Sequence, residues 1–227
     1  HTQDDVAETF LLRLARGSGS DGVAGMARFD PPFLRPLLPV SRAALRAWLT
    51  ERNIAWAEDP SNDDPRFDRV KARAMAQTLA GLGLDQARLV ATASVMAEDA
   101  ELLAYTTERW SSRHVRPDGP DLVLSVEAFE AAPKALAARV LSAALTWFSG
   151  VPYKPRRRAM AAWQARIADG APAPLGGVLA HRHGAAIRLY REPSRTAPPQ
   201  SLPAPGPWSW DTRWQLTGPA CAEHQVM

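Results

Sequence analysis

The sequence predicts an α/β fold in which two parts of different character are joined by a long helix. Helical patterns alternate with a short apolar run in the first part, apolar residues recur every seven positions in the middle, and strand and helix patterns mix in the last part. The predicted segments are an α/β part over residues 1–82, a helical connector over 83–118, a smaller α+β domain over 119–192, and a Pro-rich linker with an incomplete tail module over 193–227.

The first part should begin with a helix over residues 5–16, because apolar residues recur there at spacings of three and four and Gly17 stands at a natural C-cap position. Residues 17–25 contain four glycines and predict a loop. The apolar run over residues 33–40 is broken by proline, and we interpret it as a strand of an α/β sheet near its end.

Two more helices should follow in the first part. Ser41 is expected to cap the first of them, which should end at Asn53. Its buried face should carry Leu45, Trp48 and Leu49. The spacing of Ser61 and Asp64 matches a capping box for the next helix, over about residues 66–80.

The connector should be one helix from Asp85 to about Ser112. Its apolar residues recur every seven positions, at Leu89, Met96, Leu103 and Trp110. This spacing is typical of a long helix packed along a partner.

The second part predicts a mixture of strands and helices. The expected elements are a strand near residues 122–126, a helix over 134–148, a basic helix over 155–168, and a hairpin over 175–192 with His183 and Gly184 at its turn. Residues 193–207 contain six prolines and predict a stiff linker. Beyond it, a strand-like face should carry Trp208, Trp210, Trp214 and Leu216 as core residues.

Composition restricts the class of protein. Cys221 is the only cysteine, which excludes an internal disulfide and favours a reducing compartment. No apolar stretch approaches the roughly 18 residues of a membrane helix, and no leader peptide is visible. We therefore expect a soluble cytoplasmic protein that makes no membrane contact. Because the chain starts with His1 and helical periodicity begins almost at once, we also expect it to be incomplete.

Charge is distributed unevenly along the chain. Residues 1–121 carry a net charge of −3 and residues 122–227 a net charge of +6, and only three of the 27 basic residues are lysines. The planar guanidinium of arginine suits phosphate binding and base stacking, which favours a nucleic-acid partner. An Arg-rich composition can equally reflect genomic base composition, so charge alone leaves both interpretations open.

The opening stretch HTQDDVAET contains the first candidate site residues. Thr2 and Asp5 match a T-x-x-D capping box, and acidic residues at a helix start are favoured by the helix dipole. The alternative is an acidic pair, Asp4 and Asp5, that holds Mg²⁺ through oxygen ligands and helps to orient phosphates. The irregular spacing of His1, Asp4 and Glu8 argues against a zinc site.

Two further motifs admit a phosphate-binding and a structural interpretation. In RGSG, residues 16–19, the glycine amides could form an anion nest, or they could only cap a helix and begin a loop. In DRVKAR, residues 68–73, Arg69 and Arg73 stand one helical turn apart, which suits a phosphate clamp but also a solvated face paired with Asp64 and Asp68.

The densest positive run is YKPRRR, residues 153–158. It could track a phosphate backbone while Tyr153 and Trp163 provide stacking contacts, and a basic helix start favours an anionic partner. The candidate nucleic-acid contacts are Lys154, Arg156, Arg157, Arg158 and Arg166. A solvated basic face is the alternative. His181 and His183 alternate on a strand and are interpreted as a solvent-facing pair.

The P-loop pattern G-x-x-x-x-G-K-[ST] and the nucleophile-elbow pattern G-x-S-x-G do not occur in the 227 residues, and no dinucleotide-binding pattern G-x-G-x-x-G follows a predicted strand. Four stretches, however, occur together in a specific order: HTQDDVAET, LLRLARGSG, RPLLPVSRAALRAWL and AEDPSNDDPRFDRVKAR. This combination resembles the bacterial tRNA(Ile)-lysidine synthases, a family of the PP-loop ATP pyrophosphatase group. The resemblance covers residues 1 to about 115 strongly and residues 120–192 by general pattern.

The resemblance implies a fold and a reaction. Residues 1–82 would be the C-terminal part of a Rossmann-like PP-loop domain with a parallel sheet, and residues 119–192 would bind tRNA. Such enzymes use ATP and Mg²⁺ to adenylate C2 of the wobble cytidine in a tRNA(Ile) with a CAU anticodon. The side-chain amine of free L-lysine then displaces AMP. The oligomeric state stays open, and a homodimer is one hypothesis.

The resemblance also implies site residues. Asp5 matches the essential acidic position of the family, and would be a Mg²⁺ ligand, with His1 and Asp4 beside it. Arg16, Gly17 and Gly19 match the R-G-[ST]-G loop near the nucleotide and the target base. Arg69 and Arg73 match an R-N-x-x-R element implicated in holding phosphate or the adenylated intermediate, although Val70 replaces the usual Asn.

The family's ATP-binding SGGxDS motif does not occur in these 227 residues. We therefore predict that this polypeptide alone does not form lysidine. A thiolating PP-loop enzyme is an alternative, but such enzymes commonly use cysteine pairs, whereas this chain has Cys221 alone. A non-catalytic tRNA-binding fragment is the alternative from another class.

Overall fold

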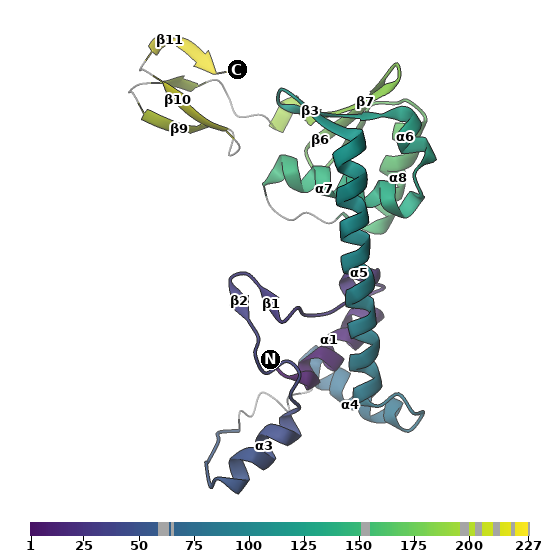
Figure 1. The fold of residues 1–227 in the computed structure, drawn as a ribbon, viewed down its shortest axis with the longest axis vertical. Helices are drawn as coiled ribbons and strands as arrows, with labels where there is room; N and C mark the ends of the chain where they lie inside the picture. Colours follow the sequence, from purple (N-terminus) through teal and green to yellow (C-terminus); the bar gives the residue numbers. More distant parts are fainter. Residues whose placement is uncertain are drawn as a thin grey trace. The chain divides into compact units, whose positions relative to one another are not determined.

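The computed structural model describes residues 1–58, 64, 66–150 and 155–195, and the backbone of four further strands between residues 200 and 226. The chain divides into two units, His1–Ala104 and Tyr105–Met227, whose elements are labelled in Figure 1. Helix α5, Gln86–His114, begins in the first unit and ends in the second.

The first unit is mainly helical. Its elements before α5 are α1 (Gln3–Ala15), α2 (Ser20–Val23), β1 (Phe29–Asp30), β2 (Phe33–Leu34), α3 (Arg42–Glu51) and α4 (Asp68–Ala80). Its core is formed by α1, Val23 of α2 and the start of α5. The buried residues of this core are Val6, Ala7, Phe10, Leu11, Val23, Leu89 and Ala93. Because α1 is buried along this face, its polar residues next to the core are held in fixed positions.

Two predicted helix starts are confirmed. The Asp5 carboxylate accepts a hydrogen bond from the Thr2 backbone N–H at 2.7 Å, as expected of a capping box. The Ser41 Oγ accepts one from the Ala44 N–H at 3.1 Å, so Ser41 caps α3. At the other end of α3, Asn53 adopts a positive φ of 52°, in agreement with its predicted role in ending the helix.

Removing the Ser41 cap should lower stability. Ser41→Ala leaves the Ala44 N–H without its side-chain acceptor, and we expect the free energy of unfolding to fall by about 1 kcal/mol. Ser41→Asp keeps an acceptor and should unfold at nearly the wild-type denaturant concentration. Urea unfolding followed by circular dichroism measures both variants. Equal stability of all three proteins would contradict the assigned cap.

Several predictions for the first unit are wrong. Residues 33–40 do not form one strand: only Phe33–Leu34 is extended, in an exposed two-residue hairpin with Phe29–Asp30. Pro36 and Pro39 lack the N–H groups that a longer strand would need to donate. The segment 17–25, predicted as a loop, contains the short helix α2.

The predicted burial and capping of two helices also need correction. No residue of α3 is buried, and the Trp48 side chain is 49% exposed. Helix α4 begins at Asp68 with Phe67 as its N-cap residue, so the predicted box of Ser61 and Asp64 does not cap it. Ser61 itself lies outside the described residues. The Asp64 carboxylate instead accepts hydrogen bonds from Arg66.

The long helix predicted over residues 85–112 is confirmed as α5. Leu89 and Ala93 are buried in the core of the first unit, and Trp110 packs against the core of the second. Met96 and Leu103, the other positions of the seven-residue repeat, are half-buried, as are Ala100 and Thr107, which follow each of them by four residues. One stripe of the helix therefore carries its least exposed residues, as a heptad pattern predicts.

The second unit is built on a five-stranded antiparallel sheet in the order β3-β4-β7-β6-β5. The strands are β3 (Val115–Asp118), β4 (Asp121–Ser125), β5 (Ala173–Leu175), β6 (Val178–His183) and β7 (Ala186–Arg191). The predicted strand and hairpin correspond to β4, β6 and β7, and Gly184 turns the hairpin with a φ of 59°. The edge strands β3 and β5 were not predicted.

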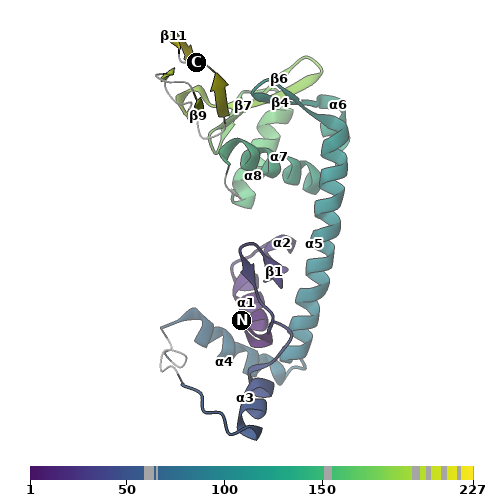
Figure 2. The same ribbon diagram turned by 60° about the vertical axis from the view of Figure 1, so that its left-hand side comes forward.

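Three helices accompany this sheet: α6 (Val126–Ala131), α7 (Lys134–Ser149) and α8 (Arg157–Ala168). The last two were predicted, whereas α6 was not. Figures 1 and 2 show α7 and α8 on the same side of the sheet. Leu141 and Leu145 of α7 and Ile167 of α8 are almost completely buried against Leu124 and Leu189 of the strands. This two-layer packing forms the core of the second unit.

Residues beyond the sheet contain a short 3₁₀ helix, η2 (Pro193–Arg195), and four strands. The strands are β8 (Gln200–Leu202), β9 (Gly206–Trp210), β10 (Trp214–Gly218) and β11 (Cys221–Val226). The predicted strand-like face is confirmed at the backbone, because Trp208 pairs with Leu216 and Trp210 with Trp214. The prediction of a linker over residues 193–207 is too broad, since η2 and β8 lie within it.

All strand pairs of the described residues are antiparallel. The predicted combination of helices and strands is confirmed, and the sheets that they form are antiparallel. Among the described helices, none has the length and apolar character needed to cross a membrane.

Candidate functional site

The first unit has a cleft of about 560 Å³ formed by α1, α3 and α4. Its polar lining is dominated by arginines. The lining residues are Glu8, Thr9, Leu12, Arg13, Arg16, Arg42, Phe67, Asp68, Arg69, Val70 and Arg73. An arginine-rich cleft with a buried carboxylate at its wall can hold an anion and a cation at the same time.

Asp5 lies at the start of α1 with 9% of its side chain exposed. One carboxylate oxygen accepts from the backbone and hydroxyl of Thr2, at 2.7 and 3.1 Å. The other accepts from Arg42 Nη2 at 2.8 Å, and Arg69 Nη1 lies 4.0 Å from it. Burial alone would raise the pKa of Asp5, but the Thr2 hydrogen bonds and the Arg42 charge outweigh it and hold the pKa below its usual value.

This lowered pKa predicts a contribution of Asp5 to acid stability. A carboxyl whose pKa is lower in the folded than in the unfolded state stabilises the fold above the unfolded pKa of about 4, and the contribution is lost as pH falls through the folded pKa. Asp5→Asn should therefore lose stability at pH 7 and show a shallower fall in stability below about pH 4. Denaturant unfolding from pH 7 to pH 2 measures this. Parallel curves for both proteins would contradict it.

Glu8 lies one turn after Asp5 on α1, and only 4% of its side chain is exposed. Its Oε1 accepts from Arg73 Nε at 3.0 Å, and Arg73 Nη2 is also 3.0 Å away. Its Oε2 is buried and has no hydrogen-bond partner among the described residues. A buried carboxylate oxygen without a donor is costly unless a ligand supplies one, so this atom marks the wall of the cleft as a binding position.

Arg42, the first residue of α3, connects the two carboxylates. Its Nη2 is 2.8 Å from Asp5 Oδ1 and its Nη1 is 3.7 Å from Glu8 Oε1. Its backbone N–H donates to Asp4 Oδ2 at 2.8 Å. The start of α3 is therefore fixed to the start of α1 by side-chain and backbone contacts, which holds both acidic groups in one arrangement.

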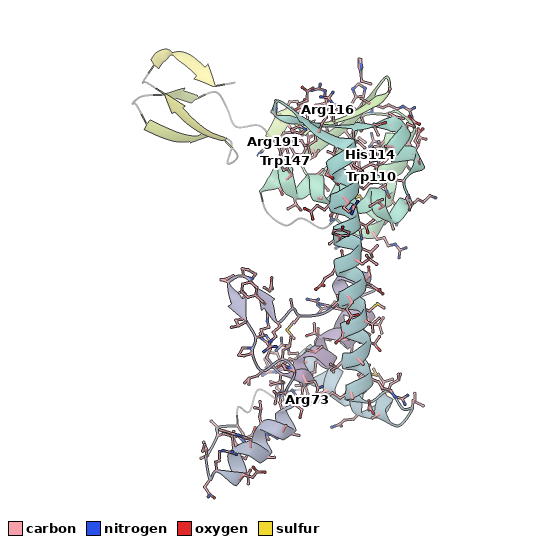
Figure 3. The ribbon with its side chains drawn as sticks, in the orientation of Figure 1. Arg73, Trp110, His114, Arg116, Trp147 and Arg191 are labelled. Carbon is pink, nitrogen blue, oxygen red and sulfur yellow. The ribbon has the colours of Figure 1, made fainter. Side chains whose placement is uncertain are left out.

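Of the residues predicted for the first site, Arg16, Arg69 and Arg73 line the cleft, and Asp5 lies beside it, 4.0 Å from Arg69. Arg69 and Arg73 line the cleft from the same face of α4, and Figure 3 labels Arg73 there. Arg69 lies next to the carboxylate of Asp5, and Arg73 next to that of Glu8. Arg16 also lines the cleft, 3.2 Å from Asp68 Oδ2, with both side chains exposed.

Asp5 and the remaining residues predicted for this site are not part of the cleft lining. His1 is exposed before α1, and Asp4 bonds the first turn of α3. The Gly17 N–H donates to the Leu14 carbonyl at 2.9 Å, and Gly17 has a φ of 67°. Gly19 is the N-cap residue of the short α2. The structural interpretation of Gly17 therefore has direct support, because its amide is occupied by the end of α1.

The basic candidates of the second part lie on or before α8. Arg157 and Arg158 are exposed on its first turn, and Arg156 is its N-cap residue. Arg166 is also exposed, but its Nη2 donates to the Pro172 carbonyl at 2.7 Å. Lys154 and Tyr153 lie outside the described residues. The proposed stacking role of Trp163 is wrong, because this side chain is 2% exposed and its Nε1 donates to the Ala173 carbonyl.

Sequence reasoning missed Glu8 and Arg42. As a site residue, Glu8 was considered only as an unsuitable zinc ligand, although its spacing of three residues from Asp5 puts both on one face of the helix. Arg42 has no motif of its own, and only the fold brings it to residues 37 positions earlier in the chain. Arg13 was also missed; its Nη1 donates to the carbonyls of Gly22 and Gly25 and so holds the segment after α2.

The described residues contain no group of three or more His, Cys, Asp or Glu side chains arranged to hold a metal ion. Mg²⁺ commonly needs only one or two protein carboxylates, because water and substrate phosphates complete its shell. The Asp5 carboxylate lies near the arginine-lined cleft, but its oxygens already accept hydrogen bonds from Thr2 and Arg42, so the described side chains do not by themselves form a magnesium site.

Comparison with known proteins gives consistent matches. Residues 1–79 match the PP-loop domain. The whole chain is 39% identical over 230 residues to 54% of a tRNA(Ile)-lysidine synthase of Ruegeria pomeroyi. A tRNA(Ile)-lysidine synthase of Mycolicibacterium paratuberculosis is 35% identical over 86% of this chain and 63% of its own length. One of Rhodopseudomonas palustris is 52% identical over 48% of this chain and 32% of its own length. The chain spans about half the length of the first of these relatives.

Proposed function

Because this chain is homologous over its whole length to tRNA(Ile)-lysidine synthases, we propose that the protein containing it ligates L-lysine to the wobble cytidine of tRNA(Ile). The reaction would have two steps. The C2 oxygen of the cytidine attacks the α-phosphate of ATP, and pyrophosphate leaves. The side-chain amine of lysine then forms a bond to C2, and AMP leaves with that oxygen. The tRNA with a CAU anticodon is the proposed substrate.

The structural observation that supports this proposal is a buried carboxylate, Glu8, in the wall of an arginine-lined cleft, with Asp5 one turn away. Glu8 Oε2 has no hydrogen-bond donor among the described residues, so it can accept from an ammonium or amine. Arg69 and Arg16 are exposed at the same cleft and can bind phosphate oxygens. A site that binds lysine and a nucleotide phosphate needs both kinds of group close together.

We assign roles in this site on that basis. Arg16, Arg69 and Arg73 bind the phosphates of ATP or of the adenylated cytidine, and Arg73 also holds Glu8 in place. Asp5 is the protein ligand proposed for Mg²⁺, which would neutralise the developing charge on the phosphates. Gly17 and Gly19 are proposed to shape the approach of the target base next to Arg16, and His1 and Asp4 to border the nucleotide.

The finer organisation is also part of the proposal. Residues 1–82 would be the C-terminal part of a PP-loop domain that includes a Rossmann-like parallel sheet, residues 83–118 the connector, and residues 119–192 the tRNA-binding domain. Lys154, Arg156, Arg157, Arg158 and Arg166 would contact the tRNA. The protein would act in the cytoplasm, where tRNA is modified, and a homodimer is the proposed assembly.

A direct reconstitution tests this function. The full-length protein is incubated with ATP, Mg²⁺, radiolabelled L-lysine and tRNA(Ile) with a CAU anticodon, and labelled tRNA is measured after acid precipitation. Label should enter this tRNA and should require ATP. A tRNA with the wobble cytidine replaced by uridine is the matched control and should stay unlabelled. No ATP-dependent label in the CAU tRNA would overturn the proposed function.

A further inference from the structure

A second cleft, of about 340 Å³, lies in the unit Tyr105–Met227 where α5 passes into β3. Its lining contains basic, hydroxyl and apolar side chains. The lining residues are Ser112, Arg113, His114, Val115, Arg116, Val123, Leu124, Ser125 and Ala186. None of these carries a carboxylate, so the cleft presents cations without local acidic compensation.

The two arginines of this cleft differ from their neighbours in the same unit. Arg188 bonds both Asp121, at 2.6 Å, and Asp118, and Arg182 bonds Glu130 at 2.7 Å. Arg113 and Arg116 are exposed and form no side-chain hydrogen bond or ion pair with any described residue. Their guanidinium groups are therefore available to an external anion.

The cleft is held by rigid elements. Trp110 packs against the core of the second unit, and its ring lies 4.7 Å from the ring of His114, centroid to centroid. Val115, the first residue of β3, also packs against that core. Figure 3 shows Trp110, His114 and Arg116 along this junction of α5 with β3. Because both elements are anchored, the backbone positions that carry the lining side chains are fixed before a ligand binds.

The cleft lies at the edge of the sheet and is lined from both faces, by Val115 and Leu124 on the core side and by Arg116 and Val123 on the other. Leu122 and Leu124 point into the core that these helices cover, so Val123, between them, faces the other way. Arg116 pairs with Val123 in register and shares its face. No residue of α8 lines this cleft.

We propose that this second cleft binds a phosphodiester group of RNA, with Arg113 and Arg116 as the phosphate contacts and His114 beside the neighbouring nucleotide. The inference rests on the proposed function for the identity of the RNA, a tRNA. Planar guanidinium groups match the oxygens of a phosphodiester, and the serine hydroxyls at the rim can bond ribose or phosphate. The net charge of +6 over residues 122–227 would favour the approach of a polyanion.

The test compares tRNA binding by two matched double variants of the 227-residue chain. Arg113→Gln with Arg116→Gln removes two charges from the cleft. Arg28→Gln with Arg88→Gln removes two charges from exposed arginines of the first unit, whose side chains also lack ion pairs with the described residues. Dissociation constants for fluorescently labelled tRNA(Ile) are measured by anisotropy from 50 to 300 mM KCl, with circular dichroism as the folding control.

The cleft variant should bind tRNA on the order of tenfold more weakly near 0.1 M salt, and the slope of log K against log salt should fall by about two, one for each lost phosphate contact. The Arg28 and Arg88 variant should retain the wild-type slope and affinity. Unchanged binding by a folded cleft variant, or no tRNA binding by the wild-type chain, would overturn the proposal.

Two additional measurements complete the test. The first shows whether the ligand of the cleft is RNA or a small anion. The second separates a failure of this inference from a failure of the proposed function. If inorganic phosphate binds the wild-type chain at millimolar concentration and the cleft variant loses only that binding, the cleft takes small anions and the RNA proposal is wrong. Lysidine formation by the full-length protein is measured independently. If the cleft variant binds tRNA more weakly but the full-length protein forms no lysidine, only the proposed function is overturned. If the full-length protein forms lysidine but the cleft variant binds tRNA normally, only this inference is overturned.

Discussion

Replacing Arg42 by alanine is expected to lower lysidine formation by the full-length protein about a hundredfold, because displacement of catalytic groups by about 1 Å can cost that much. Arg42 is the group that touches both buried carboxylates, at 2.8 Å from Asp5 and 3.7 Å from Glu8. Without it, the two acidic side chains repel each other with less compensation and no longer keep a fixed separation. We expect the loss mainly in kcat, since Arg42 positions other groups.

Two variants make this result specific. Arg42→Lys keeps the charge, but a single ammonium cannot bridge two carboxylates as the guanidinium does, so activity should be only partly restored. Arg46 lies one turn further along α3 and pairs with Glu58 at 2.6 Å, with both side chains more than half exposed. Arg46→Ala should therefore retain nearly full activity. Activity of Arg42→Ala within about threefold of wild type would contradict the positioning role.

Replacing Trp163 by alanine should destabilise the second unit by about 3–5 kcal/mol, the usual cost of removing a large aromatic side chain from a core. Trp163 is 2% exposed and belongs to the core between the sheet and its helices. Its Nε1 also donates to the Ala173 carbonyl at 2.6 Å, which ties α8 to the edge strand β5. Alanine would leave both a cavity and a buried carbonyl without its donor.

Trp147 provides the matched control for this prediction. It lies on α7 in the same unit but is 46% exposed, with one edge contact to the Phe148 ring at 4.7 Å. Trp147→Ala should cost about 1 kcal/mol. Trp163→Phe keeps most of the packing but not the donor, and should cost about 1–3 kcal/mol. Denaturant unfolding by circular dichroism measures all three; equal midpoints for Trp163→Ala and Trp147→Ala would refute the assigned core role.

The helices that could be predicted are those whose signals are local. The Ser41 cap of α3, the capping box at Asp5 and the seven-residue repeat of α5 depend on residues within one or two turns, and each is confirmed. The edge strands β3 and β5 were missed because they are short and contain prolines, so their extended form depends on pairing with β4 and β6. Residues 33–40 were wrongly predicted as a strand for the same reason: an extended segment needs a partner strand, and among the described residues only Phe29–Asp30 pairs with it.

The candidate site could be predicted where it followed one helix face. Arg69 and Arg73 stand one turn apart on α4, and both line the first cleft as that spacing suggested. Arg42 could not be found in this way, because its contacts with Asp5 and Glu8 join helices that are distant in sequence. The burial of Glu8 was missed for a related reason: whether a carboxylate on a helix faces water depends on what packs beside it, here Arg73 of α4.

The most direct test of the central claim is AMP release by the full-length protein carrying Asp5→Asn. Asparagine keeps the shape of the side chain but removes the charge next to Arg42 and Arg69. We predict that adenylation of tRNA(Ile), measured as tRNA-dependent pyrophosphate release from ATP, is abolished, and that the release of AMP on addition of lysine is lost with it. Because most tRNA affinity should come from basic residues elsewhere, the dissociation constant for tRNA should change by less than about threefold. Wild-type release of AMP by this variant would contradict the assignment of the first cleft as the catalytic site.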